Sequence, residues 1–274
     1  SLTLGEYLNK EKLSKEFIDY HIIPMVAAIW SMPPYEASLM PLSFFLKFFQ
    51  NHGLFKLKNR PQWYTVSNRS RTYVNKILNK ISGEHYKNYK INLIKRHKEN
   101  IEIFYGDKNE FFTYDKVVIA THADEALSIL ENPTEDEKTL LSNFKYKSNL
   151  AVIHTDKNQM PKNKKAWSAW NAKLSKNVRE NSSVTYWLNL LQNLKIDEDI
   201  FLSLNPFDRI DEQKILNKVT FTHPYYDKLA LENQTELKKI QNVNNTLFCG
   251  SYFGYGFHED GITSSIDMLK SIND

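Results

Sequence analysis

Several features that define common protein classes are scarce or absent in this sequence. Its 274 residues include one cysteine, Cys249, so no disulfide framework forms within the chain and a reducing, cytoplasmic location is expected. No uncharged apolar run reaches the roughly 18 residues of a membrane span, and no signal peptide opens the chain. The eight histidines are dispersed without the spacing of a zinc site, so no metal centre is expected.

Glycine is also scarce, and none of the eight glycines forms G-x-G-x-x-G after a strand, the fingerprint of a dinucleotide-binding βαβ unit. No G-x-S-x-G elbow or Walker loop is present, so hydrolase and phosphoryl-transfer activities have no support. The 36 basic and 32 acidic residues give a net charge of +4, which does not favour a nucleic-acid-binding protein. Ser1 stands where an initiator methionine is expected, which suggests a trimmed or partial chain.

Apolar and aromatic residues, at 41% and 13% of the chain, are sufficient for a large core. The first third favours helices. Ser14 is a plausible N-cap for an apolar helix with a kink at Pro24, and a second helix is predicted from about Pro41 to Asn51. Four phenylalanines of that second helix are expected in the core, with a ligand pocket or a membrane-touching patch as alternatives: Phe44, Phe45, Phe48 and Phe49.

The spacing of apolar residues changes after Gly83 from a helical pattern to short segments that alternate or are apolar throughout. An antiparallel meander is predicted from three of these segments: 89–94, 101–105 and 111–114. Residues 117–120 are wholly apolar and predict a buried strand, followed by His122, either a structural residue or an acid or base. Thr134 and Glu137 form a capping box. Further strands are predicted at 149–154, 184–188, 200–204 and 215–222, with a solvated lysine-rich loop over 157–176.

The C-terminal stretch combines a short apolar strand, a loop of aromatics and glycines, and a helix. Gly261 is predicted at the mouth of that helix, where free N–H groups favour an electron-rich ligand edge. Four apolar residues recur at helical spacing and predict an inward face: Ile262, Ile266, Leu269 and Ile272.

The run FCGSYFGYGFHEDGITSS resembles the C-terminal flavin-binding segment of the flavin-containing amine oxidase superfamily, in its bacterial branch of predicted NAD/FAD-binding proteins. Short sequence segments near the start resemble the same branch, among them PMVAAIWSMPP and RPQWYTV. Two residues of the C-terminal segment depart from the pattern, since Ser251 replaces a common glutamate and Ser265 replaces a glycine. Near the start, Asn68-Arg69 replace a glycine pair. The resemblance implies non-covalent FAD and these cofactor-binding residues: Ile91, Ala120, Thr121, Gly250, Ser251, Asp260, Gly261 and Ile262.

The implied architecture is a mixed α/β, two-lobed flavin-oxidase-like fold, with a partial Rossmann-type FAD lobe and a substrate lobe of helices and a mixed sheet. Four segments follow: a mostly helical substrate-side segment, 1–85; FAD-lobe strands, 86–123; the substrate lobe with its sheet, 124–240; and the C-terminal FAD-binding segment, 241–274. The chain then corresponds to the C-terminal two-thirds of a flavoprotein, and a missing N-terminal segment is a possible partner.

The resemblance implies an FAD-dependent oxidoreductase that transfers a hydride from a substrate C–H bond to flavin N5. The small-molecule substrate would be an amine or an unsaturated, lipid-like compound, flanked by Tyr252, Phe257 and Trp187. His258 and Tyr255 are the catalytic candidates, and the alternative role for His258 and Glu259 is to orient the loop by hydrogen bonds. The alternative is a non-catalytic remnant or binding module without functional FAD.

Overall fold

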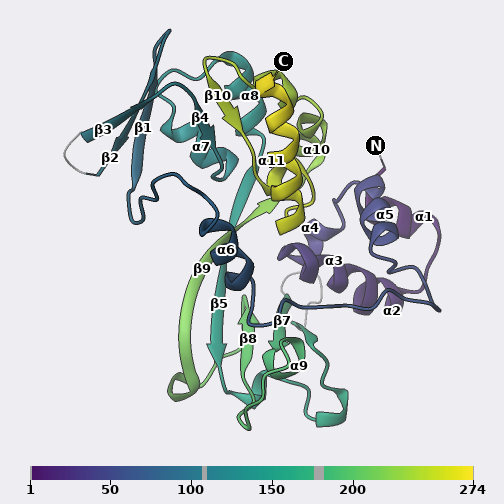
Figure 1. Ribbon diagram of the computed structural model, residues 1–274. Coiled ribbons are helices and arrows are strands. Elements are labelled where there is room, and N and C mark those ends of the chain that lie inside the picture. The colour runs from purple at the N-terminus through teal and green to yellow at the C-terminus, as the bar shows by residue number, and fades with distance from the viewer. Residues whose placement is uncertain (1, 107–109, 176–181, 274) are drawn as a thin grey trace. The chain divides into compact units, whose positions relative to one another are not determined.

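The computed structural model describes residues 2–106, 110–175 and 182–273, which divide into two compact units (Figure 1). Unit 1 comprises Ser1–Ser82 and Lys147–His223, and unit 2 comprises Gly83–Tyr146 and Pro224–Asp274. The predicted mixed α/β, two-lobed fold is confirmed. In this division residues 124–146 and 224–240, which were predicted in the substrate lobe, belong to unit 2.

Unit 1 begins with a series of helices: α1 (Leu4–Lys10), α2 (Lys15–Phe17), a π-helical turn (Ile18–Ile22), α3 (Ile23–Trp30), α4 (Pro34–Ala37), α5 (Leu42–Asn51) and α6 (Arg71–Leu78). Ser14 caps α2 as predicted, its hydroxyl accepting from the Phe17 N–H at 3.2 Å. Pro24 occupies the second position of α3. Because proline has no N–H to donate, the helix does not run uniformly through this point, and the π turn directly precedes α3.

The phenylalanines of α5 lie in the core of unit 1. All four side chains are buried, and the Trp30 ring lies 5.6 Å from Phe44 and 4.7 Å from Phe48, measured between ring centroids. These rings therefore form no membrane-touching patch, and the core prediction is confirmed. By contrast, α6 buries none of its residues.

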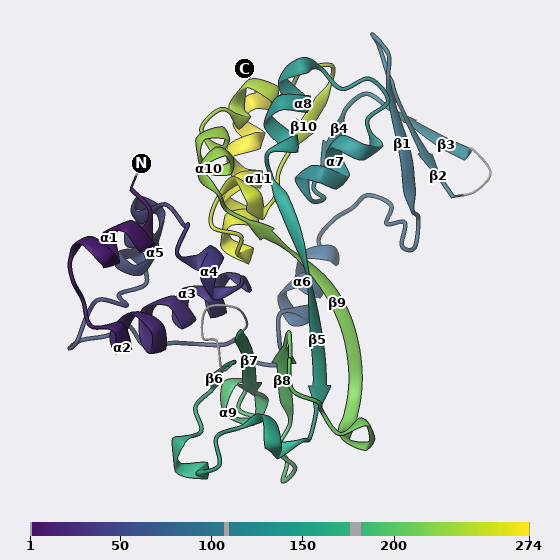
Figure 2. The same cartoon turned by 180° about the vertical axis from the view of Figure 1, so that it is seen from behind.

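The sheet of unit 1 has the strand order β6-β7-β8-β5-β9: β6 (Trp170–Leu174), β7 (Ser182–Trp187), β8 (Phe201–Leu204), β5 (Lys145–His154) and β9 (Ile215–Tyr225). α9 (Leu188–Leu191) follows β7, and Figure 2 shows β5 beside β9 from behind. The predicted lysine-rich loop is wrong over β6, which pairs antiparallel with β7. The Asn171 amide donates to the Thr185 carbonyl, and the Trp170 ring meets Tyr186 edge-on at 5.3 Å.

A buried polar network joins three strands of this sheet. His154 Nδ1 accepts from the Asp156 N–H at 3.1 Å, so its Nε2 carries the proton and donates to Ser203 Oγ at 2.8 Å. Ser203 Oγ lies 2.7 Å from the Thr185 hydroxyl. Burial lowers the pKa of His154 to about 4, although the Asp156 carboxylate acts in the opposite direction. The imidazole is therefore neutral at pH 7.

Unit 2 contains the predicted antiparallel meander: β1 (Ile91–Arg96), β2 (Ile101–Tyr105) and β3 (Glu110–Tyr114). A second, parallel pair joins β4 (Val117–Ile119) to β10 (Thr246–Phe248). The helices are α7 (Ala123–Ile129), α8 (Glu135–Ser142), α10 (Lys228–Gln234) and α11 (His258–Asn273). Short 3₁₀ turns complete the chain at Lys157–Gln159, Lys164–Ala166, Glu212–Lys214, Leu237–Ile240 and Ser251–Phe253.

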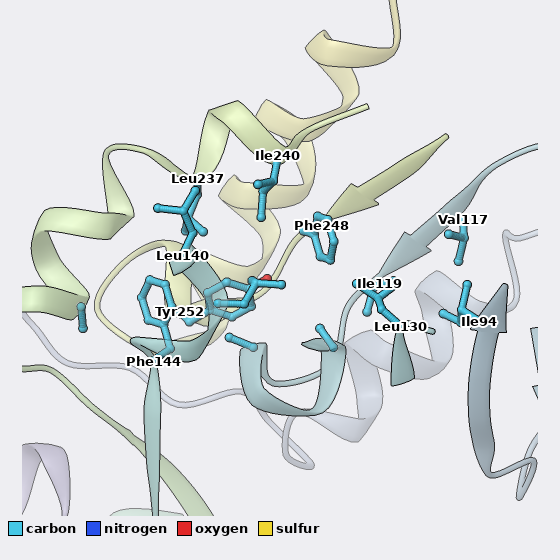
Figure 3. Close-up of a cluster of buried hydrophobic side chains, with 14 of the residues drawn as sticks. Ile94, Val117, Ile119, Leu130, Leu140, Phe144, Leu237, Ile240, Phe248 and Tyr252 are labelled. Carbon is cyan, nitrogen blue, oxygen red and sulfur yellow. The ribbon is translucent and has the colours of Figure 1, made fainter. Parts of the chain in front are cut away.

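The core of unit 2 collects apolar side chains from both ends of its sequence. Figure 3 shows Ile119 and Phe248, from the two parallel strands, in the same cluster as Leu237, Ile240 and Phe144. A buried ion pair holds the margin of this core, since the Arg96 guanidinium donates to both carboxylate oxygens of Glu137 at 2.6 and 2.9 Å. Glu137 also closes the predicted capping box of α8 with Thr134.

Candidate cofactor site

The parallel strands β4 and β10 bring together residues about 130 positions apart in the sequence. Ile119 is paired with Phe248, and the Cys249 N–H donates to the Ile119 carbonyl at 3.1 Å. The chain therefore leaves the two strands side by side, with Ala120 and Thr121 following β4 and Gly250 following β10. In open α/β sheets, ligands bind beyond the carboxyl ends of the parallel strands.

Gly250 begins the loop after β10 in a conformation that only glycine adopts readily, with φ of 154°. A Cβ at this position would meet the Tyr252 ring at 2.8 Å. The Gly250 N–H donates to Ser264 Oγ at 2.9 Å, and the same hydroxyl donates to the Gly261 carbonyl at 2.8 Å. Ser264 thus ties the loop to the first turns of α11.

Hydrogen bonds from the backbone and from Gln234 hold the rest of this loop. The Ser251 carbonyl accepts from the N–H groups of Gly254 and Gly256 at 3.1 and 3.2 Å. The Gln234 amide donates to the carbonyls of Tyr252 and Gly254 at 2.9 and 2.6 Å. Sequence analysis missed Gln234 and Ser264, because a single glutamine or serine at a distance along the chain carries no periodic signal.

The helix after the loop begins earlier than predicted. α11 starts at His258, so Gly261 lies inside its first turn rather than at its mouth. The Asp260 carboxylate accepts from the Phe257 N–H at 2.9 Å and lies against Gly254, where a Cβ would clash with Asp260 Oδ1. Asp260 therefore fixes the loop that leads into the helix.

A small open niche lies over Gly261. A Cβ at Gly261 would have only one heavy atom within 4 Å, the Ser251 nitrogen at 3.9 Å. Within the described residues, the Ser251 N–H donates to no acceptor. The niche thus offers a free backbone donor beside a helix N-terminus, which suits an electron-rich ligand edge. Backbone that is open at a glycine fits the approach of a flat ring system.

Two sequence predictions are wrong in this segment. Tyr252 is buried in the core of unit 2, with its ring 5.1 Å from that of Phe144, so it does not line a substrate pocket. The side chains predicted to face inward on α11 are instead exposed: Ile262, Ile266, Leu269 and Ile272. Ser264 and Met268 are buried in their place, and Met268 packs on Leu247 and Cys249.

An uncovered apolar surface adjoins the site. Val118 of β4 is 47% exposed, so the strand is not wholly buried as predicted. Val118 pairs with Leu247 and therefore shares its sheet face, the face that Met268 covers only in part. In the described residues, β4 has no neighbour on its second edge. α11 also carries exposed apolar side chains, and we call the four exposed side chains of β4 and α11 the open face: Val118, Ile262, Ile266 and Leu269.

The catalytic and substrate-pocket candidates occupy different positions. Tyr255 is half-buried, and burial, with a smaller effect of the Asp260 charge, raises the pKa of its hydroxyl, which therefore stays protonated at neutral pH. Phe257 and His258 are exposed where α11 begins. Trp187 lies in unit 1, where its Nε1 donates to Asp199 Oδ1 at 3.1 Å. Ile91 packs at the margin of the unit 2 core.

His122 has a packing role at the start of α7. Its ring stacks on Tyr146 with centroids 4.1 Å apart, and the Ala123 N–H donates to the Tyr146 hydroxyl at 2.9 Å. Burial raises the pKa of Tyr146, so this hydroxyl is neutral. The environment supports the structural alternative for His122.

Neither a protein-family model nor a curated protein matches the sequence. Solved structures do match. A CLA-producing fatty acid isomerase from P. acnes is 14% identical with a TM-score of 0.66, and the match covers 98% of this chain and 66% of that enzyme. Cyclohexylamine oxidase from Brevibacterium oxydans is 12% identical with a TM-score of 0.62, over 100% of this chain and 68% of that enzyme.

Putrescine oxidase bound to putrescine gives a TM-score of 0.61 at 9% identity, again over 100% of this chain and 68% of that enzyme. The chain thus spans about two thirds of the length of these relatives. At such low identity the similarity establishes architecture rather than activity. The similarity shows that this chain shares the fold of these three enzymes over the matched region, including the arrangement of β4, β10 and α11.

Proposed function

We propose that this chain forms the greater part of an FAD-dependent oxidoreductase of the amine-oxidase type. The observation that carries the proposal is the meeting of Ala120-Thr121 with Gly250-Ser251 at the carboxyl ends of two parallel strands, beside the niche over Gly261. When bound, FAD would supply the hydride acceptor, at N5, for a substrate C–H bond.

The residues of the niche would hold and polarise the cofactor. The Ser251 N–H and the first turn of α11 present positive dipoles, which favour negative charge at the pyrimidine edge. The path of the cofactor to the niche would be lined by Ala120, Thr121 and Gly250. Ile262 would lie beside Gly261 on the helix, and Ile91 would lie near the adenine of FAD. Asp260 would act indirectly, because its carboxylate is engaged by the loop backbone.

A dinucleotide-binding segment would complete the enzyme. The chain lacks G-x-G-x-x-G, and its solved relatives are longer by about a third of their length. A further parallel strand added to the free edge of β4, with its helix, would cover the open face and so complete the cofactor lobe. We therefore propose that an N-terminal segment, on the same chain or a separate one, contributes this unit.

The substrate is proposed to be a small amine or an unsaturated, apolar acid or lipid. The solved relatives include oxidases of putrescine and cyclohexylamine as well as an isomerase of fatty acids, so the fold accommodates both chemistries. Phe257 and Trp187 are candidates to flank it. Tyr255 would donate a hydrogen bond rather than accept a proton, and His258 is the candidate proton carrier. We also propose a cytoplasmic location, given the lone thiol of Cys249.

The test is to co-express the chain with a segment that carries the glycine fingerprint and to identify any flavin released on denaturation. The proposal expects FAD, and its visible bands should bleach anaerobically with one of the two substrate classes. Bound FMN, or FAD that neither an amine nor an unsaturated acid reduces, would contradict the proposed activity. Absence of any flavin would favour the alternative, a binding module that retains the substrate lobe without the cofactor.

A further inference from the structure

The free Ser251 N–H in the niche belongs to a peptide bond whose orientation is fixed from its other side. That peptide bond joins Gly250 to Ser251, and the Gly250 carbonyl accepts from the Phe253 N–H at 3.2 Å. The peptide bond is trans, so its C=O and N–H groups point in opposite directions. The Ser251 N–H therefore points away from Phe253, and it meets no acceptor within the described residues.

A second peptide bond, between Tyr252 and Phe253, repeats this arrangement. Its N–H is the donor to the Gly250 carbonyl, and its own carbonyl, that of Tyr252, accepts from the Gln234 side-chain amide at 2.9 Å. We call these two groups, the 250–251 and 252–253 peptides, the aligned peptides. Hydrogen bonds run in one direction from Gln234 through the aligned peptides to the Ser251 N–H. Because bonds in such a chain polarise one another, the last donor is strengthened.

The contacts of Gln234 require a side chain that donates twice. Besides the Tyr252 carbonyl, its amide donates to the Gly254 carbonyl at 2.6 Å. Since both partners are carbonyls, the amide nitrogen faces the loop, and its two hydrogens match the two acceptors. An apolar side chain or a carboxylate in its place would leave both carbonyls without this donor.

Gln234 also lies on a firmly anchored element. It is the last residue of α10, whose N-cap Asp227 accepts from the Ala230 N–H at 2.9 Å. Ala230 is fully buried, and the turn that follows α10 buries Leu237 and Ile240 in the core of unit 2 (Figure 3). The core of unit 2 therefore fixes the position of the amide that holds the loop.

We infer that Gln234 is a positioning residue for the flavin, because it fixes the Ser251 N–H through the aligned peptides. The inference rests on the proposed function and deepens it, since it assigns part of the control of the cofactor's redox potential to a residue that acts through the loop. A donor fixed in the niche favours the more electron-rich, reduced cofactor over the oxidised one. Gln234 should therefore raise the midpoint potential of bound FAD.

A purely structural role for Gln234 is the alternative. Loss of its two hydrogen bonds would destabilise the loop in either case, so the stability of the chain does not distinguish the two roles. The midpoint potential distinguishes them, because only the positioning role links this amide to negative charge on the cofactor.

The experiment measures the midpoint potential of FAD, against a reference dye, in the complex of the 274-residue chain with the dinucleotide-binding segment. Gln234→Met removes both donors at nearly constant size. It should lower the ratio of the affinities for reduced and oxidised FAD about tenfold, the effect of weakening one hydrogen bond to a charged group. For a two-electron couple this is a fall of about 30 mV.

Gln159→Met is the matched control. Gln159 is 5% exposed, and its amide donates to the Arg209 carbonyl at 3.1 Å, within unit 1. The variant therefore loses a buried amide that holds backbone, but one that has no link to the aligned peptides. Its complex should keep the midpoint potential of the parent.

A second measurement follows the aligned peptides without the cofactor. In Gln234→Met the Tyr252 carbonyl loses its donor, so the 252–253 peptide should turn more freely and release its bond to Gly250. Hydrogen exchange of the Phe253 amide in the chain alone should then accelerate about fivefold. Gln159→Met should exchange this amide at the rate of the parent.

The outcomes separate this inference from the proposed function. Equal potentials in the parent and Gln234→Met complexes, both with FAD bound, would overturn the inference alone. An equal fall in Gln159→Met would also overturn it, because general loosening would then explain the shift. A parent complex without FAD would contradict the proposed function, and the inference with it. If Gln234→Met does not fold, Gln234→Asn, whose amide is one methylene shorter, replaces it with the same expectation.

Discussion

Replacing Ile266 and Leu269 by serine tests whether the open face of α11 receives another segment of the protein. The two side chains are 55% and 54% exposed in the described chain. Full burial of a side chain of this size stabilises a protein by about 1.5–3 kcal/mol, and about half of that remains to be gained at each position. The double variant should therefore bind the dinucleotide-binding segment about 2 kcal/mol more weakly, which is roughly a 30-fold increase in Kd.

The assay is titration of the purified chain with that segment, followed by flavin fluorescence or calorimetry. Leu229→Ser is the matched control, since Leu229 is 52% exposed on α10 in the same unit. All three substitutions remove exposed side chains, so the circular dichroism spectrum of the chain alone should be unchanged. Equal Kd values for the double variant and the control would refute the assignment of the open face.

Three further substitutions, two of them with a matched control, test the described interactions separately. Arg96→Ala should lower the free energy of unfolding by about 3–5 kcal/mol in denaturant titrations, because it leaves a buried carboxylate unpaired. Lys138→Ala, in an exposed pair, should lower it by less than about 1 kcal/mol, so equal losses would contradict this account. The folded pKa of His154, about 4, lies below its usual 6.5, so the unfolded state binds the proton more readily. The free energy of unfolding should fall as pH decreases from about 6.5 to about 4, and a His154→Gln variant that keeps the whole of this pH dependence would refute the cause. Gly254→Ala should displace the carboxylate beside it, destabilise the chain by about 1–3 kcal/mol and weaken flavin binding. Gly106→Ala, whose Cβ meets no atom within 4 Å, should leave flavin binding unchanged, and equal losses of flavin would show that crowding is not the reason.

Short-range sequence patterns correctly predicted the caps and strands that depend on residues close together in the chain. The capping box of Thr134 and Glu137, the N-cap at Ser14 and the meander of β1 to β3 are present as expected. Each of these depends on residues a few positions apart, so the sequence contains the complete signal. The two-lobed mixed α/β fold followed from the resemblance and is confirmed by the structure.

The wrong predictions concern which surface is covered. Helical spacing correctly placed Ile262 and Ile266 on one side of α11, but spacing does not show what packs against that side. Tyr252 belongs to an aromatic loop in the sequence, yet the turn at Gly250 directs its ring into the core. β6 was predicted as part of a solvated loop because lysines surround it in the sequence. Its pairing with β7 is a tertiary interaction that the local sequence does not show.

The supporting residues of the candidate site depend on contacts that sequence spacing does not encode. Gln234 donates to two carbonyls of the glycine loop from α10, and Ser264 accepts from the Gly250 N–H from α11.

The central claim is that this chain completes an FAD site together with a dinucleotide-binding segment. The most direct test is the visible absorption spectrum of the chain purified alone and after co-expression with a segment carrying G-x-G-x-x-G. Flavin bands that appear with the segment and are much weaker without it are the predicted result. A complex that forms but holds no flavin, while a control flavoprotein prepared in parallel retains its own, would contradict the claim.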